Sequence, residues 1–279
     1  GPSGVGKTRL ATEVIAAAAP SHLVQVRATR VSSSMPLGAF AQVLAASGGV
    51  EGDAAQLKDA ATQLLDGLAD DEQLLVSVDD VHLLDDTSAT LLLHLAMSGR
   101  ADLLLTLRSG EEVPEPVTLL WRDELVARMD VSPLDNDAMA TLLDQVLPGG
   151  VDGMVASTLV GSSGGNLLYL RELVTGLRDS GVLTRSHGHW TLTGPVTPPP
   201  RLSELIEQRL ASLGEPARRL LDAVALGDHL GIHSLEASGQ WELAQELLDA
   251  GLVDYVEHGR RRQLRAKHPL HVEVARSTM

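Results

Sequence analysis

The chain has 279 residues, contains no cysteine and carries a formal net charge of −15 at pH 7. The lack of cysteine excludes disulfide bonds, thiolate metal sites and cysteine nucleophiles. So much negative charge repels nucleic acid phosphates, which predicts weak non-specific binding of DNA. No apolar run approaches the roughly 18 residues of a membrane span, so we expect a cytoplasmic protein without a membrane partner.

The chain begins with a phosphate-binding loop motif. Residues 1–8 match the pattern G-x-x-x-x-G-K-[ST] and are Gly1, Pro2, Ser3, Gly4, Val5, Gly6, Lys7 and Thr8. The glycines allow the backbone to wrap around a phosphate with its N–H groups pointing inward. In this motif Lys7 reaches the β- and γ-phosphates and the Thr8 hydroxyl binds Mg²⁺. The motif predicts a site for ATP or ADP with Mg²⁺.

Helix-like and strand-like segments alternate after this loop. We expect helices at residues 8–19, 36–46, 54–68 and 86–97, the last capped by Asp86, and strands at residues 23–27, 74–78, 103–107 and 128–131. This alternation predicts an α/β fold with a P-loop NTPase parallel sheet and helices on both faces, in residues 1–132. Because a P-loop normally follows a buried strand, we expect the first strand to precede Gly1 and the chain to be a fragment.

The later part of the chain is mainly helical. The pattern of residues 133–193 predicts a helical lid with a short hairpin. Residues 194–200 contain four prolines, which predicts a stiff linker. Helices followed by two strand-like runs predict a winged-helix domain at residues 201–279, truncated at its end.

Two further elements carry candidate chemistry. The apolar run 74–78 leads into Asp79 and Asp80, as in a Walker B strand, where Asp79 would hold the Mg²⁺ shell and Asp80 would orient or deprotonate the attacking water. A strand also often ends in Asp simply because Asp suits turns. After the next apolar run, Arg108 is either a sensor of the γ-phosphate or a solvated residue at a strand exit.

In their order and spacing these elements resemble the STAND class of P-loop ATPases, and in particular the ATPase part of large ATP-binding LuxR-type transcriptional regulators. The stretches that carry the resemblance are GVGKTRL (residues 4–10), PLGAF (36–40), VDDVH (78–82), LR (107–108), GNLLYL (165–170) and HPL (268–270). The resemblance covers nearly the whole chain.

The resemblance implies an ADP-bound resting state and an ATP-bound active state. It implies that Arg108 is a sensor arginine, that Arg9 and Asn166 belong to the nucleotide site, and that His268 touches the β-phosphate of ADP. Asn166 falls in a lid motif that usually reads Gly-Asn-Pro, and Leu167 occupies the proline position. For His268, a buried structural role stays open as the alternative.

We therefore expect an ATP/ADP-binding switch module of a LuxR-type regulator, which hydrolyses ATP slowly and controls an intramolecular clamp. Contact with DNA would come only through a missing downstream helix-turn-helix domain. An activating ligand or protein is expected, and self-association in the ATP state is possible. The alternative is an AAA-type ring ATPase that acts on DNA or protein. A small-molecule P-loop kinase is a further alternative, although no acceptor-binding motif is present.

Overall fold

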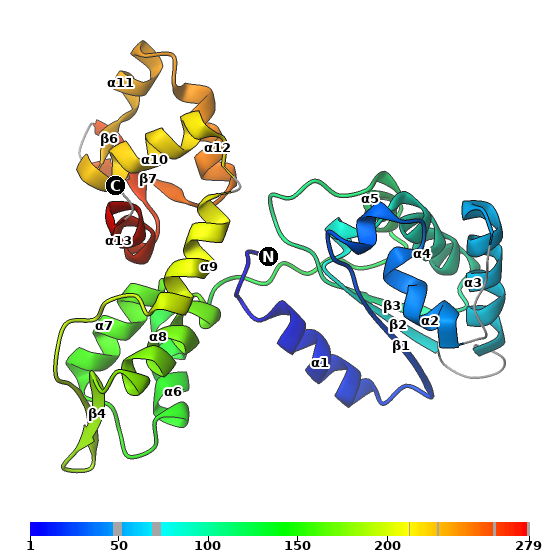
Figure 1. The fold of residues 1–279 in the computed structure, drawn as a ribbon, viewed down its shortest axis with the longest axis horizontal. Coiled ribbons are helices and arrows are strands. Elements are labelled where there is room, and N and C mark those ends of the chain that lie inside the picture. Colours follow the sequence, from blue (N-terminus) through cyan, green and yellow to red (C-terminus); the bar gives the residue numbers. More distant parts are fainter. Residues whose placement is uncertain (47–51, 69–73, 212, 228, 259–260, 278–279) are drawn as a thin grey trace. The chain divides into compact units, whose positions relative to one another are not determined.

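The computed structural model describes the chain except for residues 47–51, 69–73, 212, 228, 259–260 and 278–279. It contains two compact units (Figure 1), one formed by Gly1 with Gly6–Val131 and the other by Pro2–Val5 with Ser132–Met279. Within the described residues, no helix is long and apolar enough to cross a bilayer.

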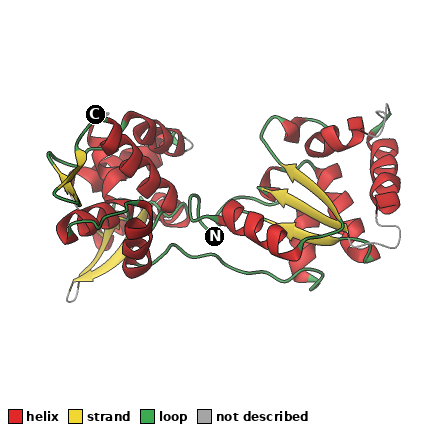
Figure 2. Cartoon of the chain, turned by 90° about the horizontal axis from the view of Figure 1, so that it is seen from below, coloured by secondary structure: helices red, strands yellow, loops and turns green. Residues whose placement is uncertain are grey.

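A parallel three-stranded sheet lies in the first unit (Figure 2). Its strands are β1 (His22–Arg27), β2 (Leu74–Asp79) and β3 (Asp102–Leu105), in the order β1-β2-β3. Arg27 pairs in register with Asp79, and Val78 pairs with Leu105. The carboxyl ends of the three strands therefore meet at one edge of the sheet, where open α/β sheets bind ligands.

Helices cover both faces of this sheet. They are α1 (Lys7–Ala18), α2 (Ala41–Ala46), α3 (Ala54–Leu68), α4 (Asp86–Ser98) and α5 (Glu115–Arg122). Because side chains alternate along a strand, Val76 and Val78 of β2 enter the apolar core with α3, α4 and α5. Ser77 and Asp79 face the other way and line a cavity with residues of α1. The predicted α/β fold, with a parallel sheet between helices, is confirmed.

The predicted strand at residues 128–131 is wrong, because these residues form no strand. A strand needs a hydrogen-bonding neighbour, and this segment passes beside Gly1 instead. A Cβ atom on Gly1 would lie 2.1 Å from the carbonyl oxygen of Val131. Among the described residues β3 is an edge strand of the sheet and pairs with β2 alone.

Helix α4 begins one residue away from the expected position. Asp85, and not Asp86, is its N-cap: the Asp85 carboxylate accepts a 2.9 Å hydrogen bond from the Ser88 N–H. The same carboxylate accepts from the Leu37 N–H at 3.1 Å. Asp85 therefore joins the start of α4 to the loop before α2. This additional contact favours Asp85 over Asp86 as the cap.

The second unit contains eight helices in its described part. They are α6 (Asn136–Val146), α7 (Gly153–Ser163), α8 (Leu167–Asp179), α9 (Pro200–Leu210), α10 (Glu215–Gly227), α11 (Ile232–Ala237), α12 (Trp241–Asp249) and α13 (Pro269–Ser277). Strands β4 (Leu183–Ser186) and β5 (His189–Leu192) form an antiparallel hairpin. Strands β6 (Leu230–Gly231), β7 (Val253–His258) and β8 (Arg261–Ala266) form an antiparallel sheet in the order β6-β8-β7. The winged-helix assignment stays a prediction.

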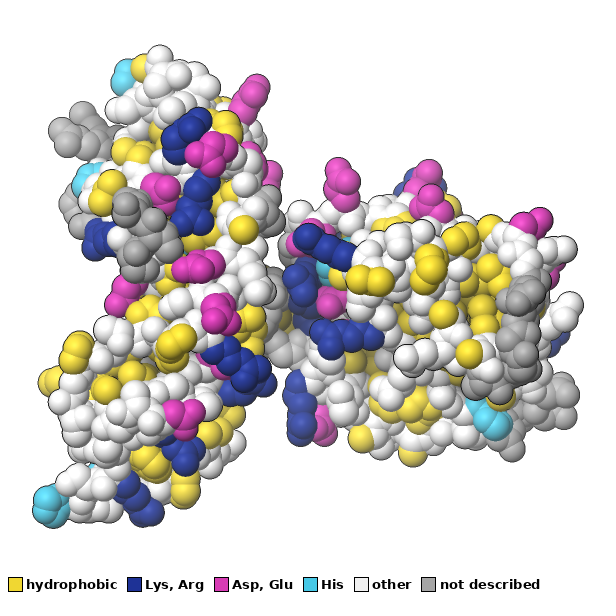
Figure 3. All heavy atoms as spheres, in the orientation of Figure 1, with side chains coloured by type: hydrophobic (Ala, Val, Ile, Leu, Met, Phe, Trp, Pro, Cys, Tyr) yellow, Lys and Arg dark blue, Asp and Glu magenta, His cyan; other side chains and the backbone are white. Residues whose placement is uncertain are grey.

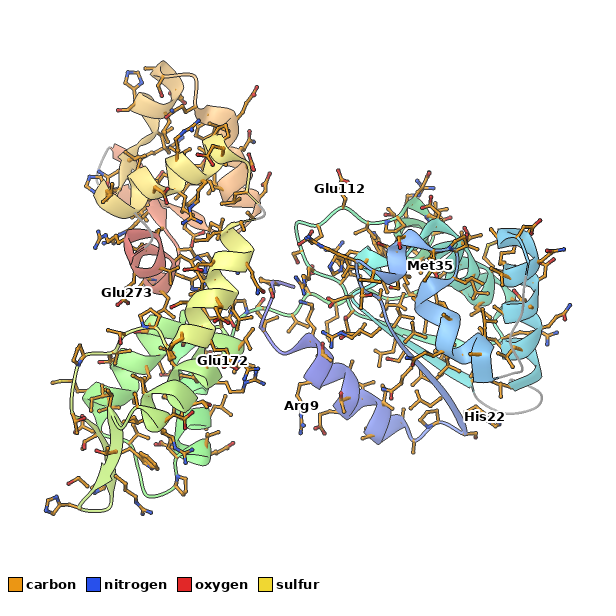
Figure 4. The ribbon with its side chains drawn as sticks, viewed as in Figure 1. Arg9, His22, Met35, Glu112, Glu172 and Glu273 are labelled. Carbon is orange, nitrogen blue, oxygen red and sulfur yellow. The ribbon has the colours of Figure 1, made fainter. Side chains whose placement is uncertain are left out.

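Helix α8 joins the two apolar cores of this unit. Leu170 and Val174 pack with α6 and α7, whereas Tyr169 and Leu173 pack with the helices from α9 onward. The Glu172 carboxylate (Figure 4) is only 6% exposed and pairs with Arg201 of α9 at 3.5 Å. The segments before and after the proline-rich linker are thus packed together through α8.

Candidate nucleotide-binding site

The N-terminus of α1 is built without a capping side chain. Gly6 occupies the N-cap position with φ of +98°, and Gly4 has φ of +81°. Both angles lie in the left-handed region that glycine adopts without steric cost. Because Gly6 has no side chain, it leaves the first N–H groups of α1 available to an anion, and the helix dipole favours negative charge there.

Lys7 is the first residue of α1. Its Nζ donates a 3.0 Å hydrogen bond to the carbonyl oxygen of Gly1, so the side chain curls back along the loop. Partial burial lowers the pKa of Lys7, while the nearby Asp80 carboxylate acts in the opposite direction. A cation that is partly removed from water interacts more strongly with an added anion than an exposed one does.

Asp79 is the centre of a hydrogen-bond network at the end of β2. Its carboxylate accepts from the Thr8 hydroxyl at 2.9 and 3.1 Å and from the Thr106 hydroxyl at 2.5 Å. The Arg27 guanidinium lies 3.9 Å from the same carboxylate. Thr106 and Arg27 are not among the predicted site residues, although Arg27 ends β1 and Thr106 directly follows β3.

Asp80 adopts a left-handed backbone conformation with φ of +60°. Its N–H donates to the Thr106 hydroxyl at 3.0 Å, so Thr106 holds both aspartates. Its carboxylate forms an ion pair with Arg108, with 3.4 Å between Nε and Oδ1. Asp is among the few residues that tolerate this backbone region, and here the conformation is stabilised by contacts from the β3 exit.

Several basic groups gather at this end of the first unit. Lys7 begins α1, Arg27 ends β1 and Arg108 follows β3. Figure 3 shows dark blue side chains concentrated at one end of this unit, although the chain as a whole is acidic. Local positive charge of this kind favours an anionic ligand.

Two other predicted site residues lie in the second unit. Asn166 is 5% exposed and caps α8, and its amide also contacts the backbone of Ser3. His268 is 7% exposed and lies against Gly164, Tyr169 and His271. Burial lowers the pKa of His268 to about 4, so the ring is neutral at pH 7.

Arg9 points away from α1 into solvent (Figure 4). Its side chain is 80% exposed, and its guanidinium pairs with Glu13 one turn later. The structure therefore does not bring Arg9 together with Lys7, Thr8 and Asp79.

The residues at the end of β2 fit a bound Mg²⁺ ion. The Thr8 hydroxyl and the Asp79 carboxylate are hard oxygen ligands, which Mg²⁺ prefers, and few protein ligands suffice because Mg²⁺ keeps several waters. They line a cavity of about 240 Å³ together with Thr106 and Arg27. A larger hollow of about 370 Å³, between residues 33–36 and 84–87, contains none of the predicted site residues. In the described part of the chain, no cluster of three His, Cys, Asp or Glu side chains offers another metal site.

Comparison with known proteins identifies the fold to which the first part of the chain is similar. A comparison with curated proteins finds no match. The ORC2 protein of Aeropyrum pernix, solved as ADPNP–ADP complexes, has a TM-score of 0.59 and 14% identity over 99% of this chain and 85% of that chain. Cdc6p of Pyrobaculum aerophilum has a TM-score of 0.51 and 12% identity over 99% of this chain and 85% of that chain. At such identities the likeness concerns the fold alone. Residues 1–113 match the family model described as AAA domain, so this part of the chain has the fold of an AAA-type P-loop ATPase.

Proposed function

We propose that this chain binds ATP and ADP with Mg²⁺ and hydrolyses ATP slowly, as a nucleotide switch. The observation that carries the proposal is the grouping of Lys7, Thr8, Asp79 and Asp80 around the end of β2 in the first unit. The nucleotides in the similar ORC2 structure support the same ligand class.

Each of these residues has a distinct role in the proposal. Lys7 supplies the charge that neutralises the β- and γ-phosphates, and Thr8 and Asp79 hold the metal. When bound, Mg²⁺ neutralises charge on the phosphate oxygens. Asp80 orients a water molecule and accepts its proton.

The ion pair between Asp80 and Arg108 supports a role in switching. The Asp80 Oδ1 atom lies 3.4 Å from the Arg108 Nε atom, so the two side chains are partners in this structure. A γ-phosphate would compete with Asp80 for Arg108, because both are anionic. In this proposal Arg108 pairs with the γ-phosphate when ATP is bound and with Asp80 when it is not. A residue that distinguishes ATP from ADP needs such a change of partner.

We further propose that the module belongs to a LuxR-type transcriptional regulator of the STAND class. The support is the succession of motifs from the P-loop to residues 268–270. In this proposal residues 1–132 are the ATPase core, residues 133–193 the lid, residues 194–200 a linker and residues 201–279 a winged helix. The winged helix acts as a clamp through His268, DNA is bound by a separate helix-turn-helix domain, and an activating ligand or protein opens the clamp.

Calorimetric titration with ADP and Mg²⁺ tests the binding site. Lys7→Ala should abolish tight binding, because it removes the main positive charge at the phosphates. Lys58→Ala is the matched control: it removes a lysine from α3, which is not at the end of β2. Equal ADP affinity in the Lys7 variant and the parent protein would exclude this site.

The second candidate function is an AAA-type ring ATPase that acts on DNA or protein. It is favoured by the fold likeness to the Aeropyrum pernix ORC2 protein over 99% of this chain. A ring ATPase needs a residue from a neighbouring subunit, so its specific activity rises with protein concentration. A switch that works within one chain has a specific activity independent of concentration.

A further inference from the structure

Part of the phosphate-binding loop is held by the N-terminus of α8 within the second unit. The Asn166 Oδ1 atom accepts from the N–H groups of Leu168 at 3.0 Å and Tyr169 at 3.2 Å, which makes Asn166 the N-cap. Its Nδ2 atom donates to the carbonyl oxygen of Ser3 at 3.0 Å. The Leu168 N–H also reaches the carbonyl oxygen of Gly4, at 3.2 Å. Both ends of the Asn166 amide are therefore engaged within the protein.

These contacts fix the orientation of two successive peptide groups. In a trans peptide the C=O and N–H bonds point in opposite directions, and every described peptide bond is trans. The Ser3 carbonyl shares a peptide with the Gly4 N–H, and the Gly4 carbonyl shares one with the Val5 N–H. Since both carbonyls point toward α8, the N–H groups of Gly4 and Val5 point away from α8. Inward-facing N–H groups are what a P-loop uses to hold phosphate.

The approach of Asn166 to the loop is close enough to require glycine. A Cβ atom on Gly4 would lie 2.3 Å from Asn166 Oδ1, and Gly4 has φ of +81°. A larger residue in place of Gly4 would therefore have a strained backbone and would also clash with Asn166.

We infer that Asn166 is a positioning residue for the phosphate-binding loop: it sets nucleotide affinity by orienting the peptides at residues 3–5, without touching the nucleotide. This inference rests on the proposed nucleotide-binding function. It gives Asn166 an indirect role in the nucleotide site, through the loop, in place of a direct contact with the ligand. Because coupling between two binding events is reciprocal, bound nucleotide should also stabilise the first turn of α8.

Asn166→Ser separates capping from positioning. Serine is a good N-cap, so α8 keeps its acceptor, but serine lacks the amide donor that reaches Ser3. Loss of this single hydrogen bond should weaken ADP binding about 3- to 10-fold, which corresponds to about 0.7–1.4 kcal/mol. Asn166→Asp is the second variant, because aspartate also caps well and directs an oxygen at the Ser3 carbonyl. It should weaken binding at least as much.

Asp152→Ala is the matched control. Asp152 caps α7 through the N–H groups of Met154 and Val155, in the same unit as Asn166 and with no contact to the loop. It should lower stability and leave ADP affinity within about twofold, since a lost cap acts on folding. Hydrogen exchange adds a readout that capping alone does not change. ADP should slow exchange of the Leu168 and Tyr169 amides in the parent protein but not in Asn166→Ser.

The outcomes are distinguishable. If Lys7→Ala loses ADP while both Asn166 variants bind it as tightly as the parent, the positioning role is wrong and the proposed function stands. If the parent protein does not bind ADP, the proposed function itself fails. Equal weakening by Asp152→Ala and Asn166→Ser would also overturn the inference, because it would reduce Asn166 to an ordinary cap.

Discussion

Replacing Thr106 with valine tests the network that holds the two aspartates. Thr106→Val keeps the side-chain shape but removes a hydroxyl that donates to Asp79 at 2.5 Å and accepts from the Asp80 N–H at 3.0 Å. Thr106 is only 8% exposed, so water replaces the lost bonds poorly. A hydrogen bond to a charged group contributes about 1.5–3 kcal/mol and a neutral one about 0.5–1.5 kcal/mol. We expect the first unit to lose about 2–4 kcal/mol of stability.

Hydrogen exchange of the buried β2 amides measures this loss, because core strands exchange through global opening. Thr106→Ser keeps the hydroxyl and should retain most of the stability. Thr90→Val is the matched control: the Thr90 hydroxyl donates only to the Asp86 carbonyl, at 2.7 Å on the exposed side of α4. It should change stability by less than about 0.5 kcal/mol.

The same variants should separate structural from functional effects. Since Thr106 orients Asp79, Thr106→Val should weaken Mg²⁺-dependent ATP binding more than Mg²⁺-free binding. If Thr106→Ser is as unstable as Thr106→Val, the methyl packing and not the hydroxyl is responsible. If Thr106→Val matches Thr90→Val in both assays, the network argument is refuted.

Three other predictions concern the aspartates and His268. Asp80→Asn should keep Mg²⁺–ATP binding but slow turnover, whereas Asp79→Asn should weaken Mg²⁺-dependent binding; turnover at the parent rate in both would contradict the Walker B assignment. Burial lowers the pKa of His268 from 6.5 to about 4, so the unfolded chain binds more protons than the native state between these pH values. Stability should therefore fall as the pH is lowered from 6.5 to 4, by up to about 3 kcal/mol, and this slope should shrink in His268→Phe but not in the exposed control His233→Gln. His268→Ala should lower the preference for ADP over a non-hydrolysable ATP analogue if His268 clamps ADP; an equal effect on both nucleotides in titrations would instead identify a structural histidine.

Those elements that depend on local sequence could be predicted. Residues 74–78 lack the alternation of apolar and polar side chains that a half-exposed strand shows. In the structure they are the buried part of β2, the central strand of the sheet. Gly6 stands where the P-loop motif requires glycine and has a positive φ, and Gly4, at a variable position of the motif, has a positive φ as well. The segment 128–131 shows the limit of such reasoning, because a short extended segment forms a strand only when a neighbouring strand is available.

The sequence by itself determined the α/β class, the position of the phosphate-binding loop and most helices, because capping residues and apolar periodicity act over a few positions. Only the tertiary structure decided which polar groups meet. Thr106 reaches Asp79 across 27 positions of the chain, and Asn166 reaches Ser3 across 163. Neither residue has a local pattern that reveals its partner, since such contacts depend on strand order and on which helix terminus packs against the loop. The shared role of α8 in two cores has the same origin, because a helix presents several faces and the chain alone does not state which neighbour covers each one.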